Sequence, residues 1–248
     1  MKNIVLATLF ATTFSMADFI GGEVDLGYYS HAPSGTAQYE GDSIDIEKDL
    51  KWDTEQDIFF KAYLEHPVPI LPNIKVGYTN FSHSGEGQPT RTFTFGNRDF
   101  VASANIKSDF DLKMYDITLY YEILDNWLNL DGGLNVKYID GEIAVDGHDS
   151  NGKPIHENTD FKLPIPMLYA KAGIDVPTTD LSFQVEGNYV SYDGNQLYDV
   201  EAGIRYLFAL GAGLEIGYKV LKVKIDDVDD FSMDTDYNGV YGKVVWDF

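Results

Sequence analysis

The sequence contains no cysteine, which excludes disulfide bridges and thiolate metal sites. Basic residues are scarce, since 18 Lys and Arg stand against 40 Asp and Glu, for a formal net charge of −22. Such an excess of negative charge repels a polyanion, so we expect no nucleic-acid partner. The charge suits a solvated exterior or the binding of cations.

Long apolar runs are lacking too. After the first residues, no segment approaches the roughly 20 consecutive apolar residues that a membrane-spanning helix needs. The apolar run over 4–11 follows a single lysine and precedes Ser15 and Ala17, small residues placed as in a cleavage site. This pattern predicts a secretory signal peptide over 1–17 and a mature domain over 18–248, with a buried amino-terminal helix as the alternative.

What the sequence does contain is a repeating alternation of apolar and polar residues. In LSFQVEGNYVSY, residues 181–192, every second residue is apolar or small, a pattern typical of a strand with one face in an apolar medium. Marked in this way, the chain has about ten strands, with eight to twelve possible, each long enough to cross a bilayer at a tilt. They run approximately over 19–29, 56–65, 74–83, 110–124, 127–140, 161–176, 181–192, 196–208, 212–225 and 237–248.

The connections between these strands alternate in length. The short ones cover 66–73, 125–126, 177–180 and 209–211, whereas the others are long, at 30–55, 84–109, 141–160 and 226–236, apart from the short 193–195. Short turns at one end and long loops at the other are typical of an outer-membrane barrel, whose short turns face the periplasm. The sequence therefore predicts an all-β, antiparallel up-and-down transmembrane barrel with both termini on the short-turn side.

Two local patterns lie near the ends of the predicted strands. The segment over 90–104 predicts a small hairpin outside the membrane that turns at its Gly-Asn pair. Up to Val220 the apolar residues of the strand over 212–225 occupy its even-numbered positions and the charged residues its odd-numbered ones. After Val220 the pattern shifts, and Leu221 and Val223 occupy odd-numbered positions. This shift indicates a bulge or the emergence of the strand from the membrane.

The parity opposite to the apolar one defines a set of charged residues that we expect to face the barrel lumen. Charges of both signs in such a set can form ion pairs that fill the interior of a small barrel. The alternative is a narrow, cation-favouring pore lined by the excess carboxylates. The set consists of Glu23, Asp25, Lys61, Lys75, Asp116, Glu122, Asp131, Lys137, Lys171, Asp175, Glu186, Glu201, Arg205, Glu215, Lys219 and Lys243.

Candidate reactive groups are few and unspecific. Ser82 and His83 lie near the predicted outer rim, where a barrel could act as a lipid or peptide hydrolase. Serine and histidine are ordinary loop residues, however, and no nucleophile elbow is visible, so catalysis is disfavoured. The acidic run with Asp226, Asp227, Asp229 and Asp230 is a candidate site for divalent cations. It lacks the closing glutamate of a calcium loop, so a solvated acidic surface is favoured. No cofactor motif is present.

Several segments are familiar in their order along the chain. LEHPVPILPN, ITLYYEILDNW, PMLYAKAGIDVP, VSYDGNQLYD and KIDDVDD together resemble a family of small Gram-negative outer-membrane β-barrel proteins. The resemblance covers nearly all of the mature chain. It implies an outer-membrane location and a single barrel, and it brings no catalytic or ligand residue.

The sequence thus favours a non-enzymatic outer-membrane barrel, structural or a narrow channel. A rim hydrolase, or adhesion and cation binding through acidic loops, are the alternatives. The strand over 237–248 has Trp246 and Phe248 on its apolar face, which resembles the signal read by the outer-membrane insertion machinery. We therefore expect membrane lipid and that machinery as the partners of this chain.

Overall fold

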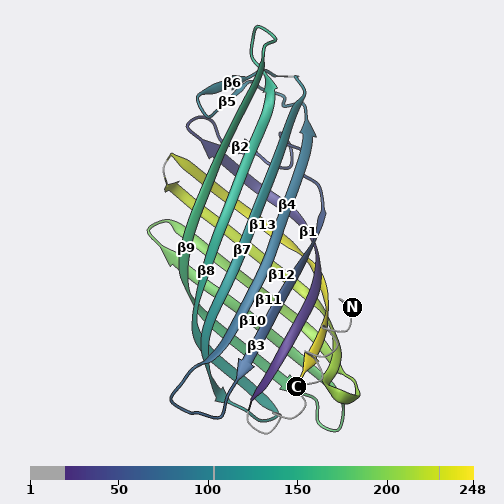
Figure 1. Ribbon diagram of the computed structural model, residues 1–248. Coiled ribbons are helices and arrows are strands. Elements are labelled where there is room, and N and C mark those ends of the chain that lie inside the picture. The colour runs from purple at the N-terminus through teal and green to yellow at the C-terminus, as the bar shows by residue number, and fades with distance from the viewer. Residues whose placement is uncertain (1–19, 103, 229) are drawn as a thin grey trace, which may run out of the picture.

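The computed structural model describes residues 20–102, 104–228 and 230–248, and it forms a closed antiparallel barrel (Figure 1). Ten strands build the wall in the order β1-β3-β4-β7-β8-β9-β10-β11-β12-β13, while β2 pairs with β1, and β5 pairs with β6 in a separate hairpin. No helix of the described segments is long and apolar enough to span a membrane. The elements are β1 (Gly21–Tyr39), β2 (Ile44–Asp45), β3 (Glu55–Glu65), β4 (Asn73–Gly87), β5 (Phe93–Phe95), β6 (Arg98–Phe100), β7 (Ile106–Leu124), β8 (Leu128–His148), β9 (Pro154–Asp175), β10 (Leu181–Tyr192), β11 (Asn195–Leu207), the 3-10 turn η2 (Ala209–Gly211), β12 (Ala212–Val228) and β13 (Phe231–Asp247).

The barrel closes where β13 pairs with β1. Their register runs without a break from Glu23 opposite Asp247 to Tyr39 opposite Phe231. The amide N–H groups of Gly22 and Phe248 each donate to the carbonyl of the other at 2.9 Å, which extends the seam by one pair. Because every wall strand is paired on both sides over at least part of its length, the sheet has no fully open edge strand.

The two ends of the barrel have different connections. At the end that holds Gly21 and Phe248, which we call the turn end, short connections join β3 to β4, β7 to β8, β9 to β10 and β11 to β12. At the opposite end, the loop end, the segments 40–54 and 88–105 are long. The β8–β9 and β10–β11 hairpins turn tightly at 149–153 and 193–194, and only two residues separate Val228 of β12 from Phe231 of β13. We call these three the tall hairpins.

These tall hairpins correct part of the sequence prediction. Most of the predicted loops 141–160 and 226–236, and the first part of 30–55, are strand in the structure. The prediction ended each strand where its outward face stopped being apolar. Beyond that point the ladder continues with polar residues outside, because nothing there requires an apolar exterior.

The barrel wall reverses its polarity halfway along. On β8, Asn135 and Lys137 are buried while Leu134 and Val136 are exposed; further along, Ile139, Ile143 and Val145 are buried and Glu142 and Asp146 are exposed. The half nearer the turn end is therefore polar inside and apolar outside, and the half nearer the loop end is built the other way round. Large exposed apolar side chains of the first half are Leu26, Ile58, Phe60, Ile74, Val76, Ile117, Leu119, Leu134, Val136, Leu168, Phe183, Val185, Ile204, Leu214, Ile216, Val240 and Val244.

This reversal also explains the phase shift after Val220. The pairing of β12 with β13 is regular from Ala212 to Ile225, so the predicted bulge at Val220 is wrong; the only register shift in this pair lies between Ile225 and Val228. Leu221 and Val223 point inward like the charged residues before them, because the interior has become apolar at their level.

Two loop-end segments cover this apolar interior. In the segment 40–54, Ile44, Ile46, Leu50 and Trp52 are buried in the core. The β5–β6 hairpin turns at Gly96 and Asn97, with φ of 60° and 58°, which confirms the predicted turn. Its three phenylalanines, Phe93, Phe95 and Phe100, are also buried in the same apolar cluster.

Candidate functional site

The interior of the turn-end half is filled by charged side chains, which we call the charged lumen. Seven basic residues face eight acidic ones, so the set is close to neutral although the whole chain is strongly acidic. Near-neutrality matters because a buried charge is costly unless it is paired. The residues are Lys61, Lys75, Lys137, Lys171, Arg205, Lys219 and Lys243, with Glu23, Asp25, Asp116, Asp131, Glu186, Asp199, Glu201 and Glu215.

One group of ion pairs crosses the lumen from β3 to the opposite wall. The Nζ atom of Lys61 lies 2.9 Å from Glu186 and 2.5 Å from Glu201, on β10 and β11. Lys75 also pairs with Glu186, and the hydroxyl of Tyr63 donates to the Glu186 carboxylate at 2.6 Å. Strands that are not neighbours in the wall are thereby tied together through the middle of the barrel.

A second group lies beside the first. Lys137 of β8 is 2.7 Å from both Asp116 and Asp199. The side-chain amide of Asn135 donates to Asp116 at 2.6 Å, and that of Asn188 donates to Asp199 at 2.8 Å. Each carboxylate thus accepts from a neutral amide as well as from the lysine, which helps to stabilise a buried ion pair.

A third group lies next to the seam. The guanidinium of Arg205 donates to Glu23 at 2.9 Å and to Glu215 at 2.8 Å. Lys243 of β13 is 2.8 Å from Asp25 of β1 and 3.3 Å from Glu215. Arginine suits the first position because its planar donors can bind two carboxylates at once.

These groups leave little free space at mid-height. The cavity among Lys61, Lys75, Lys137 and Lys219 has a volume of about 20 Å³. That volume is close to the ~10–15 Å³ that one water molecule needs. The charged side chains therefore leave room for about one water molecule in this cavity.

The predicted lumen residues do not all lie at the same depth. Lys171 is half-buried at the turn end, whereas Glu122 and Asp175 are exposed. These three, with Asp131, line a polar mouth of about 430 Å³ that opens at the turn end. Glu23 and Arg205 also line this mouth although they are buried, and the other predicted lumen residues are buried farther from the turn end.

Sequence reasoning missed two inward carboxylates. Asp199 is a ligand of Lys137, and Asp57 on β3 is buried and accepts a hydrogen bond at 2.9 Å from the Nε2 atom of His31. Asp199 shares the parity of Glu201, and Asp57 shares that of Lys61. The parity rule that found the charged lumen was therefore sufficient to find both.

Ser82 and His83, the candidate catalytic pair, lie on opposite faces of β4. His83 is buried among rings, with its centroid 5.6 Å from that of Trp52 and 5.0 Å from that of His31, while Ser82 is exposed on the outer surface. Neighbouring residues of a strand point in opposite directions, so the two side chains cannot act on one substrate. The Ser82 hydroxyl lies 3.4 Å from Asp57, at the limit of a hydrogen bond.

The acidic run at the end of β12 offers no converging ligands. Asp226, Asp227 and Asp230 are exposed, and Asp229 lies outside the described residues. Across the part of the chain that the structure describes, no group of three or more His, Asp or Glu side chains is placed to hold a metal ion.

The acidic turn between β8 and β9 binds its own backbone. The Oδ1 atom of Asp149 accepts hydrogen bonds from the amides of Lys153 at 2.9 Å and Asn151 at 2.8 Å. These hydrogen bonds hold the pKa of Asp149 below its ordinary value. The carboxylate is thus already used by the turn.

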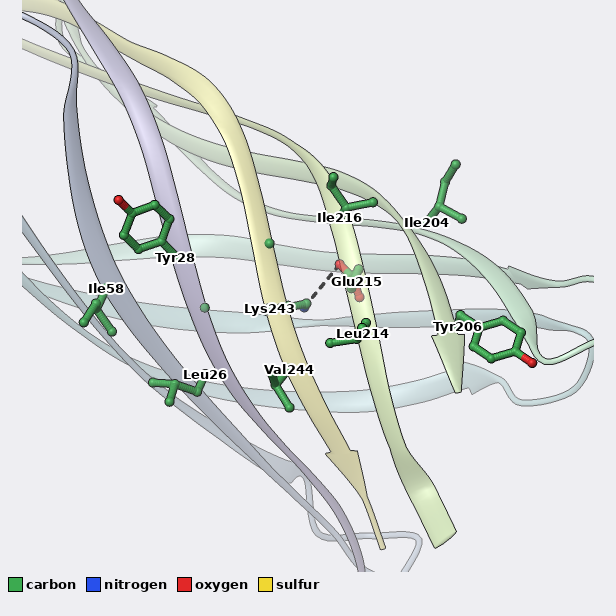
Figure 2. Close-up of a pocket in the computed structure, with 12 residues that line it drawn as sticks. Leu26, Tyr28, Ile58, Ile204, Tyr206, Leu214, Glu215, Ile216, Lys243 and Val244 are labelled. Carbon is green, nitrogen blue, oxygen red and sulfur yellow. Dashed lines mark ion pairs between the residues drawn. The ribbon is translucent and has the colours of Figure 1, made fainter. Parts of the chain in front are cut away.

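The outer face over the seam is apolar. Figure 2 shows Leu26, Leu214, Ile216 and Val244 around a groove of about 700 Å³, with the Lys243–Glu215 ion pair behind it in the wall. Successive residues of these strands therefore present hydrocarbon on the outer surface and charge in the lumen.

Trp246 and Phe248, the two candidate assembly residues, lie at the turn end of β13, Trp246 within the strand and Phe248 directly after it. Phe248 is 47% exposed, and its ring centroid lies 5.8 Å from that of Trp246. Both residues sit beside the seam, where the backbone of Phe248 pairs with that of Gly22.

Known structures align with most of this chain. The outer membrane protease OmpT of Escherichia coli aligns over 93% of this chain and 97% of its own, with a TM-score of 0.55 and 12% identity. The attachment invasion locus protein Ail of Yersinia pestis (TM-score 0.35, 10% identity, 91% and 99% of the two chains) and the toluene transporter TodX of Pseudomonas putida (0.39, 7%, 92% and 89%) are more distant. No protein-family model and no curated protein sequence matches the chain. The likeness to OmpT identifies the fold, that of an outer-membrane β-barrel.

Proposed function

We propose that this protein is an integral barrel of the Gram-negative outer membrane whose role in the envelope is structural, with a lumen that does not conduct ions. The observation that carries this proposal is the charged lumen, in which ion pairs such as Lys61–Glu201 and Lys137–Asp116 leave a cavity of about 20 Å³ at mid-height. A pore needs a continuous aqueous path, and these pairs occupy its place.

The membrane location rests on the outer surface. A band of exposed aliphatic and aromatic side chains surrounds the turn-end half, where neighbouring strands of the closed barrel pair their backbone groups with one another and do not need water. In outer-membrane barrels the short turns face the periplasm, and from this rule we infer that the loop end and its tall hairpins lie outside the cell. The resemblance of the sequence to small Gram-negative outer-membrane barrels supports the same location.

The other functions have less support. A hydrolase that uses Ser82 with His83 is disfavoured because the two side chains point to opposite faces of β4. His31 and Asp57 are both buried, and the His31 ring packs against that of Phe81, so a lipid or peptide does not reach this pair. Cation binding at Asp226 and Asp227 lacks a converging set of ligands.

Conductance across planar bilayers tests the proposal. The purified barrel should give no current steps above background at moderate voltage. The double variant Lys61→Ser/Glu201→Ser removes one cation and one anion from the narrowest level and should create small, stable steps.

A matched control is the exposed pair Lys162 and Asp140, whose Nζ and Oδ2 atoms are 3.4 Å apart on the outer surface. Lys162→Ser/Asp140→Ser makes the same change in charge outside the lumen and should stay silent. Stable steps from the unmodified protein would identify a channel and end the structural proposal. Absence of the protein from the outer-membrane fraction, together with no heat-dependent shift on a detergent gel, would contradict the location.

A further inference from the structure

The barrel wall has a gap between β9 and β10. Strand β9 pairs with β8 along its whole length, up to His148 opposite Pro154, but its pairing with β10 stops at Tyr189 opposite Leu168. The β10–β11 hairpin turns soon afterwards at Asp193 and Gly194, with φ of 48° and 83°. Residues 154–167 of β9 therefore extend past the last pair with β10.

The sequence of β9 fits an open edge. Pro164 and Pro166 lie in the part of the strand that has no β10 partner. Proline cannot donate a ladder hydrogen bond, so it is tolerated at an edge and disfavoured between two paired neighbours. The gap is thus encoded by the chain, by a short hairpin on one side and prolines on the other.

An apolar cavity of about 330 Å³ lies at this gap, at the small end of the range for ligand sites. It is bounded by Phe161 and Ile165 of β9, and it reaches Ile139, Leu197 and Val223, which are at most 3% exposed. The cavity therefore runs from the gap into the apolar core of the loop-end half. Cavities lined by such residues are dry and accept apolar molecules.

The rim of the cavity carries polar groups from β11 and β12. Gln196 and Lys224 line it, and they are opposite each other in the ladder. Lys224 forms no ion pair with any residue that the structure describes, whereas its neighbour Lys222 is 2.9 Å from Asp236.

The cavity also borders the apolar outer band. Leu168 and Tyr189, the last pair before the gap, are 65% and 48% exposed on that band. A molecule held by the band can therefore enter the cavity sideways with its apolar part first.

From these observations we propose that the cavity binds a small amphiphile with a single hydrocarbon chain and an anionic head group. The chain lies between Ile165 and Leu197, and the head group stays at the rim beside Lys224. Charge complementarity selects an anion there, and the apolar lining selects a chain without polar substituents. This inference does not depend on whether the lumen conducts.

Binding of dodecanoate to the full barrel in nanodiscs of a zwitterionic diacyl lipid tests the proposal. A dansyl-labelled undecanoate serves as the fluorescent probe, and unlabelled dodecanoate should displace it saturably. Lys224→Gln should weaken dodecanoate roughly two- to fivefold, the size of an exposed ion pair, and leave dodecanol unchanged. Lys162→Gln, on the outer face of β9, is the matched control and should leave the affinities for dodecanoate and dodecanol unchanged.

Two variants test the cavity itself. Ile165→Trp fills it and should abolish saturable binding of both compounds, whereas Phe161→Ala enlarges it and should shift the preference towards longer acids. The heat-dependent gel shift verifies that each variant is folded. Undiminished binding to folded Ile165→Trp, or no saturable displacement from the unmodified protein, would overturn the proposal. Equal weakening of dodecanoate and dodecanol by Lys224→Gln would overturn the anionic head group.

Discussion

Lys243 of β13 and Asp25 of β1 form an ion pair of 2.8 Å that joins the two strands at which the barrel closes. Both side chains are buried, and the second carboxylate oxygen of Asp25 has no other hydrogen-bond partner in the structure. Lys243 by contrast also faces Glu201 at 3.5 Å and Glu215 at 3.3 Å. The two members of the pair therefore depend on each other unequally.

We expect Lys243→Met to destabilise the barrel more than Asp25→Asn. Removing the lysine leaves three buried carboxylates without their shared cation, at a cost of about 3–5 kcal/mol in the free energy of unfolding. Removing the charge of Asp25 leaves the lysine with two carboxylates, so we expect about 1–3 kcal/mol. Urea unfolding in lipid vesicles measures both values. Lys113→Met, on the exposed face of β7, is the control and should change stability by less than about 0.5 kcal/mol.

The difference in destabilisation between Lys243→Met and Asp25→Asn is the informative result. If Asp25→Asn were the more destabilising variant, the three-carboxylate arrangement around Lys243 would not describe the folded protein. Equal and negligible effects of both variants would indicate that water enters the charged lumen freely.

Trp52 holds the segment 40–54 over the loop end. Its ring stacks on that of Phe110 at a centroid distance of 5.1 Å, and its Nε1 atom donates to Ser108 at 2.8 Å. Trp52→Ala should release this segment, because removing a large buried aromatic side chain costs about 3–5 kcal/mol. Cleavage at the exposed Lys48 and Lys51 by a lysine-specific protease should then become about a hundredfold faster.

The barrel itself should remain heat-modifiable in this variant. Trp127→Ala is the matched control, since Trp127 is 64% exposed at the turn end and should not alter cleavage at the loop end. Unchanged cleavage of Trp52→Ala would mean that the segment is held by its other buried residues.

Deleting Phe248 should impair assembly. The deletion removes the two backbone hydrogen bonds with Gly22, worth about 1–3 kcal/mol together, and the ring beside Trp246. Phe248→Ala keeps the hydrogen bonds, so it separates the backbone from the ring. We expect Phe248→Ala to refold in detergent like the unmodified protein, and to insert poorly in cells if the ring is an assembly signal. Normal insertion of both variants in cells would contradict the assigned signal.

The charged lumen could be predicted from the sequence because its residues share one parity with apolar residues on the other. Lys61, Glu201 and Lys243 were found in this way, and Asp57 and Asp199 were accessible to the same rule. Which charges pair could not be predicted, since Lys61 meets Glu186 across the lumen, from strands far apart in the chain. Such contacts depend on the strand order and on closure.

The loop-end half was harder to predict because its pattern is inverted. Ile143 and Val145 alternate with polar neighbours just as membrane strands do, but their apolar face points inward. A period of two shows that two faces differ, and it does not show which face is inside. The burial of Ile46 and Trp52 could not be predicted either, because a segment that folds back over the barrel has no periodicity of its own.

The reversal of polarity along β8 means that a single hydrogen-bonded strand takes part in two cores with different solvents. Strands β4, β7 and β13 do the same. The hydrogen-bonded ladder of these strands runs from one core into the other, as in the pairing of β8 with β9 and of β13 with β1. We therefore expect the barrel to unfold as one cooperative unit, so that a destabilising substitution in either half lowers the stability of both.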